Sequence, residues 1–173
     1  QQAKPASSAA VPAASAQAAG PGQVPVQGQA ASSQPREFID VETDLYKLRF
    51  DSEGGSLVHA ELLEHPDLID AKKNFVLLDE SKDRVYVAQT GLIGGQLPTH
   101  KSPMRFAGER QLAKGQNELV LRFESDEVGG VKLVKTYTLQ RGSYAIGVKH
   151  EVLNRGSAAV SPQLYLQLLR DRK

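Results

Sequence analysis

Apolar and polar residues alternate along much of the chain after residue 38. Residues 46–51 read Tyr-Lys-Leu-Arg-Phe-Asp, and residues 119–124 read Leu-Val-Leu-Arg-Phe-Glu. Successive side chains of an extended segment point to opposite faces, so each run gathers its large apolar side chains on one face. The pattern predicts half-buried β-strands that cover a common core.

Turn signals separate these runs. Glycine pairs occur at 54–55, 94–95 and 129–130, and two further turns are indicated at 141–142 and 154–156. Short strands with a turn about every 8–12 residues are typical of sandwiches and barrels. We therefore predict an all-β fold, an antiparallel β-sandwich that occupies residues 38–173.

Helical and loop signals are few. A single helical turn is predicted at residues 66–70, because Pro66 suits a first helical position. The segment Gly91–Pro103 contains two glycines in sequence and two prolines, and it is predicted to be a long loop.

One long hairpin is the clearest predicted unit. It pairs Val131–Gln140 with Tyr144–Leu153 around a short loop at 141–142. Leu139 is expected opposite Tyr144, and this parity puts most apolar side chains of both strands on one face. Within that apolar face, Lys135 is out of place.

Two lysines of this hairpin carry separate expectations. We expect the ammonium group of Lys135 to reach solvent along the sheet or to lie near a sheet rim. On the opposite face, Lys132 is expected to form a cross-strand ion pair with Glu151.

The first part of the chain has a different composition. Residues 1–37 are almost entirely Ala, Gln, Pro, Ser and Gly, without an aromatic residue before residue 38. Such a segment does not bury enough apolar surface to offset an ordering entropy of roughly 1–2 kcal/mol per residue. We predict a disordered linker here. The chain begins with Gln and shows no signal peptide, as expected of a processed protein or a fragment.

Charge and cysteine content narrow the function classes. The formal net charge is +1, and basic residues are scattered, which argues against a nucleic-acid partner. The absence of cysteine excludes disulfides and thiolate chemistry. The longest apolar run is four residues, whereas a membrane-spanning helix needs about 20.

Candidate catalytic chemistry rests on four histidines, His59, His65, His100 and His150. His59-Ala60-Glu61 has the H-x-E spacing of zinc deaminases, but that chemistry also requires two cysteine ligands. We expect His59 and Glu61 to be a surface pair and His150 to be a partly buried structural residue. We predict no enzyme activity, no cofactor and no metal site.

Several motifs occur together in a fixed order. They are Leu45-x-x-Leu48-x-Phe50-x-x-x-Gly54-Gly55-x-Leu57, Gly115-x-Asn117-x-Leu119-x-Leu121, Lys135-Thr136-Tyr137-Thr138-Leu139-x-Arg141-Gly142-x-Tyr144-x-Ile146-x-Val148, and Asn154. In this order and spacing, residues 38–170 resemble the periplasmic domain of the YidC/Oxa/Alb family of membrane protein insertases.

The resemblance implies a fold, a location and partners. The fold would be a β-supersandwich similar to galactose mutarotase. The domain would be the periplasmic part of an inner-membrane protein that inserts and folds membrane proteins, alone or with the Sec translocon. Its implied partners are Sec accessory subunits and substrate membrane polypeptides. The family's domain is longer, so we expect a sandwich that is incomplete at the C-terminus, with self-association through an exposed edge.

Three functions remain open from the sequence. The first is this insertase accessory domain, for which the apolar residues Leu92, Ile93, Met104 and Phe106 around the long loop form a candidate partner-contact site; burial in the domain's own core is the competing interpretation. The second is a carbohydrate-binding or mutarotase-like periplasmic protein that uses histidines and glutamates. The third is a periplasmic chaperone without a membrane parent.

Overall fold

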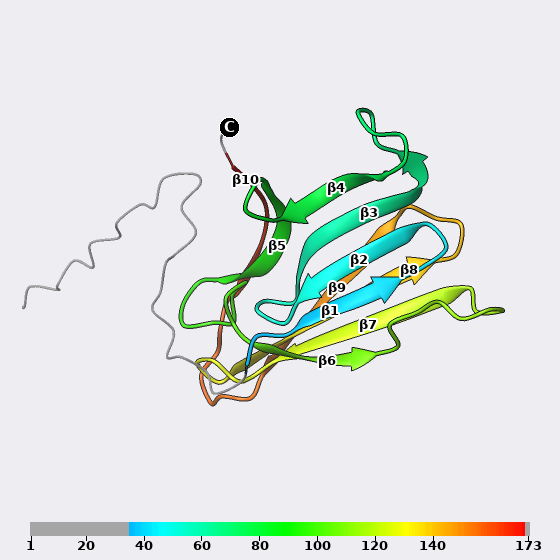
Figure 1. The fold of residues 1–173 in the computed structure, drawn as a ribbon. Helices are drawn as coiled ribbons and strands as arrows, with labels where there is room; N and C mark the ends of the chain where they lie inside the picture. Colours follow the sequence, from blue (N-terminus) through cyan, green and yellow to red (C-terminus); the bar gives the residue numbers. More distant parts are fainter. Residues whose placement is uncertain (1–34, 172–173) are drawn as a thin grey trace, which may run out of the picture.

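The computed structural model describes residues 35–171, which form ten strands and no helix (Figure 1). The all-β prediction is confirmed for this range, and the predicted linker at 1–37 lies almost wholly outside it. The strands are β1 (Phe38–Glu42), β2 (Tyr46–Asp51), β3 (Ser56–Pro66), β4 (Asn74–Glu80), β5 (Val85–Ile93), β6 (Met104–Gly108), β7 (Glu118–Ser125), β8 (Val131–Gln140), β9 (Ile146–Asn154) and β10 (Gln163–Arg170).

The strands form two antiparallel sheets that pack as a sandwich. One sheet has the order β1-β2-β3-β4-β5-β10, and the other has the order β6-β7-β8-β9. Nearly every neighbour pair is a hairpin between consecutive strands. The exception is β10, which returns from the second sheet and pairs with β5 along its whole length, from Gln163 opposite Ile93 to Arg170 opposite Tyr86.

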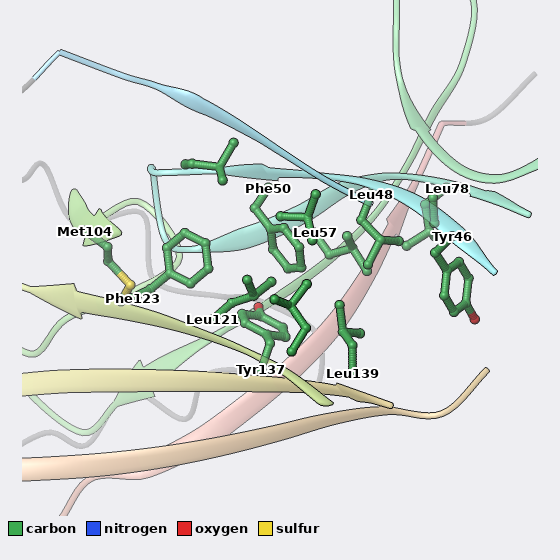
Figure 2. Close-up of a cluster of buried hydrophobic side chains, with 14 of the residues drawn as sticks. Tyr46, Leu48, Phe50, Leu57, Leu78, Met104, Leu121, Phe123, Tyr137 and Leu139 are labelled. Carbon is green, nitrogen blue, oxygen red and sulfur yellow. The ribbon is translucent and has the colours of Figure 1, made fainter. Parts of the chain in front are cut away.

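The core lies between the sheets and confirms the predicted faces (Figure 2). Phe50 and Phe123 are fully buried, and their ring centroids lie 5.5 Å apart. Tyr137 packs against Phe50 at 4.8 Å and donates its hydroxyl hydrogen to the Gly55 carbonyl oxygen. Each such aromatic pair stabilises the fold by about 0.5–1.5 kcal/mol beyond its buried area.

The β8–β9 hairpin keeps the predicted face but not the predicted register. Leu139 lies opposite Ile146, two residues beyond the Tyr144 expected from the sequence. Tyr144 instead contacts the other sheet, where its carbonyl oxygen accepts a hydrogen bond from the Tyr46 hydroxyl at 2.8 Å. The backbone N–H of Gly142 likewise donates to Asp44 in the β1–β2 turn. These contacts hold the connection as a longer loop, and an even shift preserves which side chains face inward.

This register change removes the predicted pair between Lys132 and Glu151. Lys132 lies opposite Leu153 and forms an ion pair with Glu124 on β7. Glu151 pairs with Lys149 on its own strand at 3.2 Å. The expectation was wrong because both ionic partners depend on the exact register.

The helical turn predicted at residues 66–70 is also wrong. Here Asp67 accepts hydrogen bonds from the backbone N–H groups of Ile69 and Asp70 at 2.8 and 3.0 Å. An aspartate that bonds to the backbone in this way stabilises a turn in competition with helix. The segment is the connection between β3 and β4.

The predicted loop at 91–103 begins later than expected, because β5 extends to Ile93. The remaining loop rests on the β2–β3 turn. Gly54 donates its N–H to the Ser102 carbonyl oxygen at 2.7 Å, and its φ of +75° favours glycine. A Cβ at Gly54 would overlap the backbone carbonyl of His100. Glycine is therefore required here for both conformation and space.

Candidate functional site

The four residues predicted to contact a partner lie mainly inside the domain. Leu92 and Met104 are each 2% exposed and belong to the core. Phe106 packs against that core, with its ring centroid 5.3 Å from that of Phe123. Ile93 is half-buried at the end of β5. The structure thus brings three of the four to the core, which was the competing interpretation.

A larger apolar surface lies at β10, where the first sheet extends beyond the edge of the second. Directly paired residues of antiparallel strands share a face, so Leu166 lies on the same face as its partner Thr90. Thr90 points toward the second sheet, where its hydroxyl contacts His150 of β9 at 2.7 Å. The strand β9 is the last of its sheet. Because β9 lies opposite β5, β10 extends past it, and no strand formed by residues 35–171 faces its inner side.

We call this surface the β9–β10 rim. Leu166 is 72% exposed, and the remaining members have exposures of 37–56%. The rim consists of the inward-facing apolar residues Val148, Val152, Leu164, Leu166 and Leu168. On the far face of β10, Leu169 is also half-exposed. An exposed apolar edge strand readily pairs with another strand.

Behind the rim, Lys135 lies in the core. Its side chain is fully buried, which contradicts the expected rim or solvent position. The Nζ donates hydrogen bonds of 2.6 Å to the carbonyl oxygens of Gly54 and Thr90. No carboxylate forms an ion pair with it within residues 35–171. Burial therefore lowers the pKa of Lys135 to about 7.

Two histidines lie near this lysine. His150 is the direct cross-strand neighbour of Lys135. The pKa of His150 is lowered to about 4, mainly by burial and in smaller part by the positive charge of Lys135. The Nδ1 of His100 lies 2.5 Å from the Tyr165 hydroxyl. The pKa of His100 is lowered, mainly by burial and then by the charges of Lys101 and Lys135. Neither histidine forms an ion pair with a carboxylate in the described range. The lowered pKa values favour the neutral imidazole in both residues, one beside the Thr90 hydroxyl and the other beside the Tyr165 hydroxyl.

His59 lies elsewhere, on the outer face of the first sheet. Its ring contacts Asp79 at 3.2 Å and Glu61 at 3.9 Å, and its side chain is 29% exposed. This agrees with the predicted surface pair. A cavity of about 880 Å³ lies beside His59 and is lined by Arg49, Glu61 and Arg110 among others. Its lining mixes acidic and basic side chains, so it shows no charge preference for one class of ligand.

Residues 35–171 contain neither a cluster that could hold a metal ion nor a helix that could cross a membrane. In that range, no three His, Asp or Glu side chains are grouped so that they could hold a metal ion. No helix in the same range has the length and apolar character needed to cross a membrane.

The sequence analysis expected an exposed edge at the C-terminus but did not name the residues of the rim, although one signal pointed to them. In Gln163–Arg170, leucine occurs at both odd and even positions, at 164, 166, 168 and 169. A strand with one buried face alternates, whereas leucine on both faces indicates a strand that needs cover on both sides. Thr90 and Tyr165 carried no such signal, because their partners are distant in sequence.

Known proteins match the chain across its folded part. Residues 38–173 match the family described as the YidC periplasmic domain. The chain is 46% identical over 163 residues to a membrane protein insertase YidC of Janthinobacterium sp. (strain Marseille), covering 93% of this chain and 28% of the relative. It is 43% identical over 141 residues to that of Herminiimonas arsenicoxydans, covering 82% and 25%.

A third relative, the YidC of Bordetella parapertussis, is 45% identical over 140 residues, which cover 78% of this chain and 24% of the relative. The chain thus spans about a quarter of the length of the curated relatives it matches. The family match includes all ten strands, and with them the β8–β9 hairpin and the rim. The chain belongs to the YidC periplasmic domain family.

Proposed function

We propose that this chain is an accessory periplasmic domain of an inner-membrane protein insertase, and that it acts by binding polypeptide rather than by catalysis. The observation that carries the proposal is the match of residues 38–173 to the YidC periplasmic domain, with relatives named membrane protein insertase. Its partners would be substrate membrane polypeptides and accessory subunits of the Sec translocon.

The chemistry of the described residues supports a non-enzymatic role. His100 contacts the Tyr165 hydroxyl and His150 contacts the Thr90 hydroxyl, and the pKa values of both histidines are lowered. General acid–base catalysis needs a proton donor and an acceptor that both reach the substrate. A mutarotase-like role therefore gains no specific support from this group.

The β9–β10 rim bears on how the sandwich is built. We infer that the sandwich is incomplete at β10 and that further strands of the domain pair with it in the parent protein. The support is the exposure of Leu164, Leu166 and Leu168 on the inner face, with Leu169 on the outer one. Without such cover, the same edge would pair with a second copy of this chain.

A deletion in the parent protein tests the accessory role. The whole periplasmic domain would be removed, and two quantities would be measured: insertion of a membrane substrate, and co-purification of Sec accessory subunits. The proposal expects insertion to continue at a reduced level while co-purification falls. Unchanged co-purification together with unchanged insertion would overturn it.

A sugar-binding measurement tests the alternative on the 173-residue chain. Calorimetric titration with aldohexoses, and an assay of anomer interconversion, should both give no signal. Activity that a His150→Ala or His100→Ala substitution abolishes would favour the mutarotase-like function instead.

A further inference from the structure

The connection between β3 and β4 displays two aliphatic side chains almost completely to solvent. Leu68 is 90% exposed and Ile69 is 98% exposed, whereas no other exposed large apolar residue of the described range exceeds 72%. We call residues 67–73 the β3–β4 tip. In Figure 1 the tip projects beyond the neighbouring strands, at the end of the sandwich away from β10.

The tip is an ordered turn. Asp67 Oδ1 accepts hydrogen bonds from the backbone N–H groups of Ile69 and Asp70. The N–H of Asp67 donates to the Lys73 carbonyl oxygen at 2.8 Å, and the N–H of Lys73 donates to the Asp70 carbonyl oxygen at 2.9 Å. These bonds fix the turn in which Leu68 and Ile69 lie almost fully exposed.

Charges at the tip balance one another. Asp67 and Asp70 carry two negative charges and Lys72 and Lys73 two positive ones, so the formal charge of the tip is zero. Lys73 pairs with Asp70 at 3.4 Å, and Asp67 is occupied by the turn. The contact that the tip offers is therefore apolar.

We propose that the β3–β4 tip inserts Leu68 and Ile69 shallowly into the membrane surface beside which the domain is anchored. The inference rests on the proposed function only in placing a membrane nearby. Two side chains on a convex turn provide far less than the roughly 800 Å² per partner of a stable protein interface. A bilayer interface needs no matching pocket and accepts short apolar projections flanked by polar groups.

Such a contact is weak for a free domain and effective for an anchored one. Tethering turns binding into an intramolecular step with an effective concentration that reaches the millimolar range for short linkers. The tip would then orient the domain on the membrane rather than recruit it there. Neutral overall charge predicts that the contact depends little on salt.

Fluorescence of a labelled tip tests this inference. The chain has no cysteine, so an Ala71→Cys substitution gives a single attachment point for an environment-sensitive NBD label. The labelled 173-residue chain would be tethered by an N-terminal histidine tag to vesicles of phosphatidylethanolamine, phosphatidylglycerol and a nickel-chelating lipid. We expect a blue shift and increased emission relative to the chain in buffer, and both should persist at high salt.

Substitutions identify the side chains responsible. Leu68→Ser and Ile69→Ser should each weaken the lipid contact by about tenfold, because each removes one large apolar side chain from the bilayer. Both side chains are solvent-exposed, so folding should be unaffected. Val120→Ser, at a 44% exposed apolar residue on β7, is the matched control and should leave the shift unchanged.

Three outcomes would overturn the inference. They are no shift on tethered vesicles, a shift that survives the Leu68→Ser/Ile69→Ser double substitution, and a shift that appears only when a purified Sec accessory subunit is present in the vesicles. The last would identify a protein pocket as the occupant. None of these measurements monitors insertion of a membrane substrate, so a negative result would not bear on the accessory role, which the deletion experiment tests separately.

Discussion

The Nζ of Lys135 lies 2.6 Å from the carbonyl oxygen of Thr90 and joins the two sheets through the middle of the core. A second bond, to the carbonyl oxygen of Gly54, joins the same amine to the β2–β3 turn. A neutral amine has two N–H donors and can make both bonds. A protonated amine would bring a third hydrogen and a charge into a site where residues 35–171 supply no counter-ion.

The stability of the domain should therefore rise with pH between the folded pKa of Lys135, about 7, and its ordinary value of 10.5. The pKa of Lys135 is about 7 in the folded chain and 10.5 for the ordinary side chain. In this window the unfolded chain binds the extra proton, so raising the pH favours the folded state, by at most about 1.4 kcal/mol per pH unit. Below pH 7 both states are protonated and this slope ends.

Chemical denaturation at several pH values would measure the slope, with Lys135→Met expected to abolish it. Lys149→Met is the control, because Lys149 is on the surface. Equal slopes for the wild type and Lys135→Met would show that the lysine does not titrate in this range.

Gly54→Ala should destabilise the domain far more than Gly142→Ala. Both glycines have similar φ values, +75° and +71°, so each substitution carries a backbone cost of about 1 kcal/mol. Only the Cβ at Gly54 would overlap the backbone, at the His100 carbonyl, while Gly142 has open space. We expect an additional loss of about 3 kcal/mol or more at Gly54, measured by urea denaturation. Similar losses at both positions would disprove the close approach.

Two buried serines should respond in opposite directions to alanine. The Oγ of Ser56 is buried without a hydrogen-bond partner among residues 35–171. The Ser125 hydroxyl donates to the Asp126 carbonyl oxygen and accepts the N–H of Leu133 at 2.9 Å. Ser56→Ala should be neutral or stabilising by about 1 kcal/mol, and Ser125→Ala should destabilise by about 1–3 kcal/mol. Thermal unfolding of both variants would check this, and a loss at Ser56 as large as that at Ser125 would contradict it.

The isolated chain should self-associate through β10. Leu166 is 72% exposed on an edge strand, so antiparallel pairing of two β10 strands would bury it and satisfy backbone groups. Light scattering at increasing concentration should show growth in mass for the wild type and for Val120→Lys. Leu166→Lys should remain a monomer, because each pairing would bury two charges. A strictly monomeric wild type at high concentration would count against the exposed edge.

The sequence was a good guide to faces and a poor one to register. Alternation in residues 119–124 correctly separated Leu121 and Phe123 from Arg122, because burial on one side requires a period of two. The β8–β9 register failed because Tyr144 is held by Tyr46, 98 residues away. No local pattern contains that contact.

The candidate site was less predictable for the same reason. Lys135 was recognised as out of place, but its two acceptors lie 81 and 45 residues away in sequence. Its burial is visible only once β8, β5 and the β2–β3 turn are assembled. Leu92 and Met104 were predicted as partner-contact candidates beside the long loop, whereas they lie buried in β5 and β6, because apolar character alone does not separate a partner contact from the domain's own core.

The return of β10 to the first sheet also bears on the order of assembly. Strands β1 to β5 and β6 to β9 form from neighbouring segments, whereas β10 pairs with β5 across a separation such as the 78 residues between Gln167 and Gln89. Closing so long a loop carries more entropy loss than closing a hairpin, and distant pairings form slowly. We expect β10 to dock last. During synthesis, the edge of β5 would stay unoccupied until the second sheet is complete, and this interval is when a newly made chain is most open to mispairing with its neighbours.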